Sequence, residues 1–418
     1  MAIRARRGAQ ILAASAAEQR NAALRAMADA LHHEEARLLS ANAADVDSAR
    51  EAGIGEQLID RLALNHARID GCRQALAELA AAPDVLGEVV DGRVIAGGID
   101  MKQVRVPLGV VGMIYEARPN VTVDAAGIAV KTGNAILLRG GSLAQKSNEA
   151  LVDVLRTALV DAGLPPETVQ ALDATSRQSA RELMGLHGLV DVLIPRGGAG
   201  LIASVVAEST VPVIETGTGN CHVYVHAAAE VEMTRRIVLN AKCQRPGVCN
   251  AAESLLVDRA VAPEVVPTLA RALVGEDVVL ACDAESYDLV VAALDGPDVA
   301  RRVVRATDDD WGEEYLDLKI SIRLVDGVQE AVAHINRYGT KHSEAIITRD
   351  WEAARYFERY VDAAAVYVNA STRFTDGGMF GLGAEIGIST QKLHARGPMG
   401  LTALTTTKFI LEGNGQIR

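Results

Sequence analysis

Apolar side chains recur every three or four positions along residues 7–81, with Ala and charged residues between them. This period is typical of amphipathic helices with one buried face. Breaks in the pattern predict helix ends near Ser40 and at Gly53–Gly55. The first part of the chain is therefore predicted to be entirely helical.

Between Val89 and Val106 the pattern becomes strand-like. Asp91-Gly92 has the composition of a two-residue hairpin turn, and Gly97-Gly98 predicts a further break. A two-stranded ribbon is marginally stable alone. We therefore expect this hairpin and a Thr-rich strand over residues 401–411 to pair across a subunit boundary, in a homodimer or larger assembly.

After Pro107 short apolar strands alternate with helices. The first series of strands is predicted at 110–115, 136–139, 169–172, 190–194 and 211–214. The second series is predicted at 222–226, 254–257, 320–325, 344–348 and 365–369. Such alternation implies right-handed crossovers and mostly parallel sheets, so the predicted fold class is α/β with two open parallel-sheet, Rossmann-like domains and a small β ribbon.

The chain has 418 residues and a net charge of −12, and its acidic residues are spread along the whole length. This distribution indicates a soluble globular protein and argues against a nucleic-acid surface, which needs a basic patch. No apolar stretch approaches the roughly 18 residues of a membrane span. The five cysteines are odd in number and lack zinc or disulfide spacing, so reduced thiols, a cytoplasmic location and no metal site are expected.

Cys249 lies between a predicted helix and a predicted strand, where Pro246-Gly247 turns the chain. Lys242 and Arg245 flank it, and cations favour the reactive thiolate. The alternative is a buried structural cysteine, which is the commoner fate of a free thiol. The neighbouring Cys243 is expected to face the core, because it lies at the end of the predicted helix.

Glu215 follows the apolar segment Val211–Ile214 and precedes a loop of small residues. A carboxylate at the carboxyl end of a parallel strand points into the crevice where open α/β sheets bind ligands. A helix or loop cap is the alternative interpretation.

Two turns after predicted strands are rich in glycine, and such turns present backbone N–H groups to phosphates. The candidate residues are Arg139, Gly140, Gly141, Ser142 and Lys146 in the first turn and Arg196, Gly197 and Gly198 in the second. Neither turn has the G-x-G-x-x-G spacing, but their position after two strands of one predicted sheet favours a dinucleotide cofactor.

The run Val106–Val121 resembles the aldehyde dehydrogenases, and its Tyr-Glu-Ala-Arg-Pro-Asn-Val wording resembles their gamma-glutamyl phosphate reductase branch. Four further segments resemble the same branch: 131–141, 215–222, 242–249 and 383–398. The motifs keep the order of the family and cover nearly the whole chain.

The resemblance implies roles for individual residues. Cys249 corresponds to the nucleophile, and Asn120 with the backbone N–H of Cys249 corresponds to the oxyanion hole. Arg139 stands where many relatives have a lysine that touches the adenosine ribose, and Glu314 corresponds to the glutamate that holds the nicotinamide ribose. Glu215 matches the water-activating glutamate, although Thr-Gly-Thr-Gly follows it instead of Leu-Gly-Gly-Lys, which speaks against hydrolysis.

The implied reaction is the NADPH-dependent reduction of L-glutamyl 5-phosphate to L-glutamate 5-semialdehyde, through a cysteine thioester, in proline biosynthesis. Residues 1–88 and 105–217 would bind NADPH, residues 218–380 would carry the nucleophile, and residues 89–104 and 400–418 would form the oligomerisation ribbon. A hydrolytic, NAD-dependent semialdehyde dehydrogenase is the alternative. Association with glutamate 5-kinase is left open.

The anionic substrate requires cations, and the candidates are Arg118, Arg245, Arg373, His394 and Arg396. Around Arg139 the sequence offers a second cation, Lys146, the hydroxyl of Ser142 and no acid. This composition favours NADPH over NADH, because a carboxylate at the adenosine ribose would repel the 2′-phosphate of NADPH.

Overall fold

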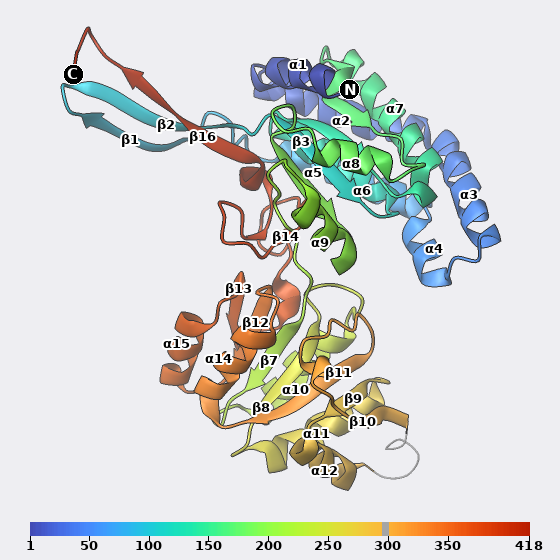
Figure 1. The fold of residues 1–418 in the computed structure, drawn as a ribbon, viewed down its shortest axis with the longest axis vertical. Coiled ribbons are helices and arrows are strands. Elements are labelled where there is room, and N and C mark those ends of the chain that lie inside the picture. The colour runs from blue at the N-terminus through green and yellow to red at the C-terminus, as the bar shows by residue number, and fades with distance from the viewer. Residues whose placement is uncertain (295–300) are drawn as a thin grey trace. The chain divides into compact units, whose positions relative to one another are not determined.

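The computed structural model describes residues 1–294 and 301–418 (Figure 1). The chain divides into two compact units. Unit 1 contains Met1–Thr216, Gly381–Gly387 and Pro398–Arg418, and unit 2 contains Gly217–Phe380 and Ile388–Gly397. The first boundary lies within two residues of the predicted one, whereas the return of residues 381–387 to unit 1 was not anticipated.

Unit 1 begins with five helices, which are α1 Ala2–Ala13, α2 Ala17–His33, α3 Glu35–Glu51, α4 Glu56–Leu62 and α5 His66–Ala81. The predicted break near Ser40 is wrong, because α3 continues through this exposed serine, which costs a helix only a fraction of a kcal/mol. The break at Gly53 is confirmed. Gly53 has φ of +72°, a conformation that ends α3.

A parallel sheet in the order β5-β4-β3-β6 forms the centre of unit 1. Its strands are β3 Val110–Tyr115, β4 Ala135–Arg139, β5 Val169–Ala171 and β6 Val192–Arg196. The helices that follow these strands are α6 Pro119–Lys131, α7 Gln145–Asp161, α8 Gln178–Met184 and α9 Ala199–Glu208. The predicted strand at 211–214 is wrong. This segment makes only an isolated bridge between Leu193 and Val213, and Pro212 has no N–H for a ladder.

The ribbon is a three-stranded sheet of β1 Val89–Ile95, β2 Ile99–Pro107 and β16 Thr405–Glu412, in the order β1-β2-β16. The predicted turn at Asp91-Gly92 is wrong, because both residues pair with β2 inside the strand. The chain turns at Gly97 and Gly98, whose φ values are +81° and +76°. The structure also corrects the expected pairing across subunits, since β16 pairs with β2 of its own chain (Figure 1).

Unit 2 has a seven-stranded parallel sheet in the order β10-β9-β11-β8-β7-β12-β13. Its strands are β7 Cys221–Val225, β8 Ala252–Asp258, β9 Val279–Cys282, β10 Val303–Arg305, β11 Lys319–Val325, β12 Ser343–Ile347 and β13 Ala365–Val368. Its helices are α10 Val231–Cys243, α11 Ala262–Gly275, α12 Ala284–Ala293, α14 Gly327–Tyr338 and α15 Trp351–Tyr360. Two short strands, β14 Ile388–Ser389 and β15 Gly397–Pro398, pair with each other. The predicted α/β class is confirmed, although β9 and β10 were missed.

The central strands β3, β7 and β8 are buried along their whole length, as parallel strands covered by helices on both faces are. None of the helices in the described part of the chain is long and apolar enough to span a membrane.

Candidate active site

Cys249 lies in the turn between the end of α10 at Cys243 and the start of β8 at Ala252, and it is half-buried. Arg373 interacts electrostatically with it, and Arg245 lies four residues before it in the same turn. Burial and the Arg245 guanidinium lower the pKa of Arg373, while charge at Cys249 acts in the opposite direction. Arg373 Nε also donates to Gln244 Oε1 at 3.1 Å. Unit 2 therefore brings together Cys249, Arg245 and Arg373, three of the predicted site residues.

The residue after the thiol anchors this turn to the neighbouring 3₁₀ turn Thr372–Phe374. Asn250 Nδ2 donates to the carbonyl oxygen of Thr375 at 2.8 Å, and the hydroxyl of Thr372 donates to the carbonyl oxygen of Asn250 at 2.7 Å. These bonds explain how Arg373, far away in the sequence, is held beside Cys249.

Gly219 packs directly against the backbone of Cys249. A Cβ atom built on Gly219 would lie 1.5 Å from the carbonyl oxygen of Cys249 and 2.7 Å from its Cα, so no side chain fits there. The same carbonyl oxygen accepts a hydrogen bond from the thiol of Cys221 at 3.2 Å. The small residues after Glu215 thus have a steric explanation, since they let the loop approach the Cys249 turn.

Lys242 does not flank the thiol as predicted. Its Nζ lies 2.5 Å from Glu253 Oε2, and neither side chain is exposed. Burial lowers the pKa of Lys242 and raises the pKa of Glu253, and each charge opposes the shift of the other. The prediction failed because helix periodicity turns Lys242 toward the core, where Glu253 of β8 compensates its charge.

The other thiols are held in the neutral form. Cys243 packs against the core of unit 2, as predicted, and burial raises its pKa to about 11. Burial also raises the pKa of Cys72 and of Cys282 to about 12 and that of Cys221 well above its usual value. A neutral thiol is a poor nucleophile, so these four cysteines are unsuited to the chemistry.

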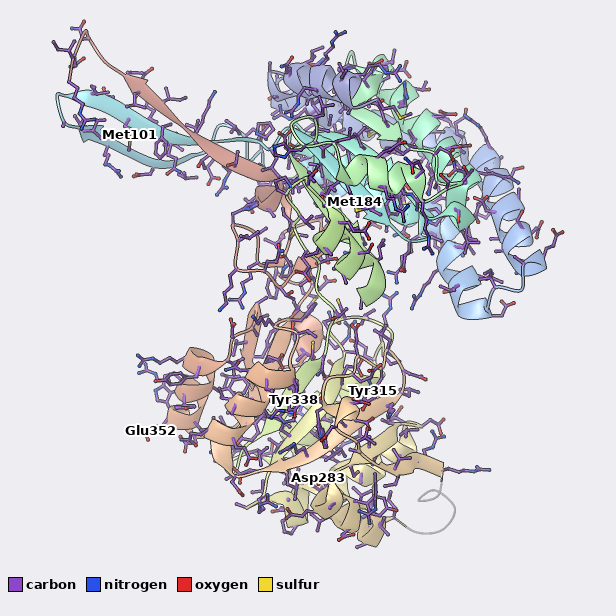
Figure 2. All side chains as sticks on the ribbon, viewed as in Figure 1. Met101, Met184, Asp283, Tyr315, Tyr338 and Glu352 are labelled. Atoms are coloured by element: carbon purple, nitrogen blue, oxygen red, sulfur yellow. The ribbon has the colours of Figure 1, made fainter. Side chains whose placement is uncertain are left out.

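Glu314 lies in the loop before β11 and is half-buried. Its Oε1 accepts a hydrogen bond from the backbone N–H of Gly219 at 2.6 Å. Burial raises the pKa of Glu314, and the bond from Gly219 opposes this shift. The adjacent Tyr315, labelled in Figure 2, anchors the loop by donating from its hydroxyl to Asp310 Oδ1 at 2.8 Å.

In unit 1 the guanidinium of Arg139 holds the loop that follows β5. Arg139 donates to the carbonyl oxygen of Ser176 at 2.8 Å and of Ala174 at 3.4 Å. The predicted absence of an acid is wrong, because Asp173 interacts electrostatically with Arg139. The same loop carries Arg177, which is exposed and whose guanidinium makes no hydrogen bond or ion pair within residues 1–294 and 301–418.

Carboxylates already occupy backbone donors near both glycine turns. Asp45 Oδ2 accepts from Ser147 N at 2.8 Å at the start of α7, and Glu116 Oε1 accepts from Gly198 N at 2.8 Å at the start of α9. A Cβ on Gly197 would lie 2.8 Å from the Glu116 carboxyl carbon. A side chain at Gly197 would displace the Glu116 side chain, so this glycine has a structural explanation that does not involve a cofactor. Ser142 and Lys146 of the first turn are exposed.

Asn120 is exposed in the first turn of α6 and donates weakly to Asp124 Oδ2, at 3.4 Å. Burial raises the pKa of Asp124 to about 6, and Arg196 opposes the shift. Arg118 precedes α6 as its N-cap residue, and Glu215 is half-buried beyond the isolated bridge. These residues belong to unit 1, whereas Cys249 belongs to unit 2.

Arg396 makes an ion pair with Asp362 at 2.8 Å, and Lys392 binds the same carboxylate at 2.8 Å. Hydrogen bonds and charge from both cations hold the pKa of Asp362 at about 2. His394 is exposed nearby in the sequence.

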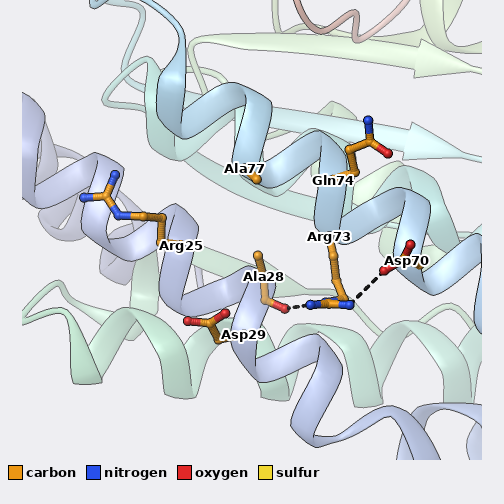
Figure 3. A pocket seen from close by; sticks show the side chains of 7 residues that line it. All are labelled: Arg25, Ala28, Asp29, Asp70, Arg73, Gln74 and Ala77. Carbon is orange, nitrogen blue, oxygen red and sulfur yellow. Dashed lines mark hydrogen bonds and ion pairs between the residues drawn. The ribbon is translucent and has the colours of Figure 1, made fainter.

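A shallow groove between α2 and α5 contains none of these residues (Figure 3). It is lined by Arg25, Ala28, Asp29, Asp70, Arg73, Gln74 and Ala77. The positive charges of its two arginines equal the negative charges of its two aspartates, and Arg73 already forms an ion pair with Asp70 at 2.8 Å. The groove has no feature of a catalytic site.

Comparison with known proteins adds a second line of argument. Residues 1–279 match the model of the aldehyde dehydrogenase family. The chain is 54% identical to the gamma-glutamyl phosphate reductase of Moorella thermoacetica, covering 99% of this chain and 97% of the relative. It is 53% identical to that of Thermobifida fusca, covering 100% of this chain and 98% of the relative.

A solved structure gives the same result. The crystal structure of gamma-glutamyl phosphate reductase from Thermotoga maritima matches with a TM-score of 0.95 and 45% identity, covering 100% of this chain and 98% of that chain. The similarity to gamma-glutamyl phosphate reductases therefore holds for the three-dimensional fold as well as for the sequence.

Proposed function

From the premise that this chain belongs to the aldehyde dehydrogenase family, and to its gamma-glutamyl phosphate reductase branch, we propose that it works through a thioester on Cys249. The enzyme is an oxidoreductase that reduces L-glutamyl 5-phosphate to L-glutamate 5-semialdehyde in proline biosynthesis. We propose roles in this reaction for individual residues from their surroundings in the structure.

The observation that carries the proposal is the setting of Cys249 among the five cysteines. It is half-buried and close to Arg245 and Arg373, whereas burial raises the pKa of each of the other thiols. Neighbouring cations favour a thiolate. The thiolate attacks the acyl carbon and phosphate leaves with the bonding electrons, because an acyl phosphate is already activated.

The thioester carbonyl then accepts a hydride at carbon, and the sulfur leaves as thiolate. Each step passes through a tetrahedral oxyanion. We propose the side-chain amide of Asn120 and the backbone N–H of Cys249 as its hydrogen-bond donors, and losing one such donor typically costs about 10²-fold in rate. Glu215 has no step in this direction, since no water attacks.

The family uses a nicotinamide cofactor, which supplies the hydride when bound. The residues of unit 1 are chemically suited to such a group. Arg139 and Arg177 follow adjacent parallel strands, β4 and β5, whose carboxyl ends lie at one edge of the sheet. Arg139 is engaged by loop carbonyls, so we propose that it positions the loop while Arg177 adds charge for the 2′-phosphate of NADPH.

On the other unit, Glu314 offers its second carboxylate oxygen to the nicotinamide ribose, while Oε1 remains on Gly219. Ser142, Lys146 and the turn from Arg196 to Gly198 are proposed as further cofactor contacts. At Gly198 the cofactor phosphate would have to displace Glu116, because one N–H cannot serve both anions.

The substrate is a small molecule with a carboxylate and a phosphate. Arg245 and Arg373 are the proposed cations for its reacting end, because both are close to the thiol. Arg118, His394 and Arg396 are proposed as further cations for the substrate. The charge of Arg396 is partly neutralised by its ion pair with Asp362.

We further propose a homo-oligomeric enzyme of the cytoplasm. Exposed apolar side chains on the ribbon, including Val94 at 65% and Phe409 at 57%, support self-association. We also propose that the enzyme associates with glutamate 5-kinase.

The reverse reaction tests the proposed route. Purified enzyme is assayed with glutamate 5-semialdehyde and NADP⁺, with and without inorganic phosphate. Thioester chemistry without hydrolysis requires phosphate as the acceptor of the acyl group, so oxidation should stop when phosphate is omitted. Phosphate-independent oxidation would instead support a hydrolytic dehydrogenase that uses Glu215.

A further inference from the structure

One hydrogen bond and one close packing contact hold the backbone carbonyl side of Cys249 in place. The thiol of Cys221 donates to the carbonyl oxygen at 3.2 Å, and Gly219 packs against the same atoms. Gly219 is itself fixed by its N–H, which donates to Glu314 Oε1 at 2.6 Å. A continuous set of contacts therefore runs from the Glu314 carboxylate through Gly219 to the backbone of Cys249.

The contact at Gly219 is tight enough to transmit a displacement. A Cβ atom at this position would lie 1.5 Å from the Cys249 carbonyl oxygen and 2.3 Å from its carbonyl carbon. Gly219 has no positive φ, so the requirement for glycine is steric. Any movement of Gly219 toward Cys249 must move the catalytic turn with it.

Glu314 is well placed to control that movement because its loop has anchors besides the bond to Gly219. Tyr315 is bound to Asp310, and the backbone N–H of Leu316 donates to Glu253 Oε1 at 3.3 Å. Glu253 is fully buried, so the loop is fastened to β8 as well. The carboxylate of Glu314 is thus a fixed acceptor toward which the N–H of Gly219 is drawn.

We infer that Glu314 is a positioning residue for the nucleophile, in addition to its proposed contact with the cofactor. Through Gly219 it holds the Cys249 turn so that the thiol stays beside Arg245 and Arg373. The inference rests on the proposed function in one respect, namely that Cys249 is the nucleophile.

The test measures thiol reactivity without any cofactor. Wild-type enzyme and variants are treated with iodoacetamide across a range of pH, and alkylation of Cys249 is followed by mass spectrometry of its peptide. Glu314→Ala should slow alkylation about tenfold and move its pH midpoint upward by about one unit, because a turn released from Gly219 lets the thiol move away from the cations that favour its thiolate form. Glu314→Gln, which keeps an oxygen acceptor for Gly219, should stay within about twofold of wild type.

Two further variants complete the experiment. Glu313→Ala removes an exposed carboxylate from the adjacent position and is the matched control, for which no change is expected. Gly219→Ala disturbs the same contact from the other side and should slow alkylation as Glu314→Ala does. Thermal unfolding of each variant shows whether it is folded.

Unchanged alkylation in folded Glu314→Ala would overturn the inference, since a glutamate that only binds the ribose has no effect when the cofactor is absent. Equal slowing in Glu313→Ala would overturn it too, because a general charge effect would then suffice. The proposed function fails separately: Cys249→Ala enzyme that still turns over would remove Cys249 as nucleophile, whatever the alkylation rates of the Glu314 variants.

Discussion

The thiol of Cys221 lies 3.2 Å from the backbone carbonyl oxygen of Cys249, so a buried cysteine contacts the turn that carries a half-buried one. Cys221 is fully buried, and burial raises its pKa well above the usual value. Cys249 is half-buried and close to two arginines. The Cys221 thiol therefore supports the turn as a neutral donor, which fits the proposal that Cys249 is the reacting thiol.

Replacement of Cys249 by alanine is expected to abolish turnover and to leave NADPH binding nearly unchanged, because the covalent step needs the thiol. Cys243→Ala should keep most of the activity, since burial raises the pKa of that thiol to about 11. Steady-state rates and fluorescence titration with NADPH check both variants. Equal loss in the two would contradict Cys249 as the sole nucleophile.

The buried pair of Lys242 and Glu253 is expected to contribute to the stability of the fold. Lys242→Met leaves the Glu253 carboxylate buried without its partner, and breaking such a pair typically costs about 3–5 kcal/mol. Lys242→Met combined with Glu253→Leu should recover much of that loss. Urea unfolding of the two single variants and the double variant measures the coupling, and additive losses would argue against a direct pair.

Cofactor choice is expected to depend on Arg177 more than on Arg139. Arg139 is engaged with loop carbonyls, whereas the Arg177 guanidinium is exposed. A charge-assisted contact with the 2′-phosphate is worth about 1.5–3 kcal/mol, so Arg177→Ala should lower the NADPH to NADH ratio of kcat/KM by roughly tenfold or more. Asp173→Asn should raise the ratio, because that carboxylate repels the phosphate.

Arg181→Ala is the matched control for this measurement, since Arg181 is an exposed arginine one helical turn away on α8. A ratio near one in the wild type would refute the preference for NADPH. If the preference for NADPH is kept in Arg177→Ala and lost in Arg139→Ala, Arg139 and not Arg177 binds the 2′-phosphate.

The ribbon is expected to hold the oligomer together. Phe409 and Leu411 of β16 are 57% and 53% exposed, which is unusual for large apolar side chains in a free monomer. Replacing both by lysine should reduce the mass measured by light scattering to that of one chain, without changing the helical content. A wild-type monomer at micromolar concentration would exclude the oligomer altogether.

His342 is expected to make the protein less stable in mild acid. Burial lowers its pKa from 6.5 to about 4, so between these values the unfolded chain binds a proton that the folded chain does not. Stability is therefore retained above about pH 6.5 and falls as the pH approaches 4, by roughly 3 kcal/mol in total. The loss of unfolding free energy between pH 7 and pH 5 should be smaller in His342→Gln than in the wild type and unchanged in the exposed control His33→Gln, since the second buried histidine, His334, is kept in both variants.

The sequence alone determined the α/β class and most of the strands, and it predicted a turn that carries Cys249. Apolar runs such as Val110–Tyr115 can be read from the order of residues, since a buried parallel strand needs apolar side chains on both faces. The Pro-Gly turn before Cys249 and the family motifs pointed to the nucleophile in the same way. The end of the helix at Gly53 was equally predictable from the sequence, because a glycine after a helical pattern commonly ends a helix.

Tertiary structure decided which charges meet. Lys242 is close to Cys249 in the sequence, yet it pairs with Glu253 inside the core, and Arg373 reaches the thiol from more than a hundred residues away. Asp173 and Arg139 meet because β4 and β5 are neighbours in the sheet. Local patterns show which way a side chain faces, but a charge acts on whatever lies within a few ångströms, and only the packing of distant segments determines that.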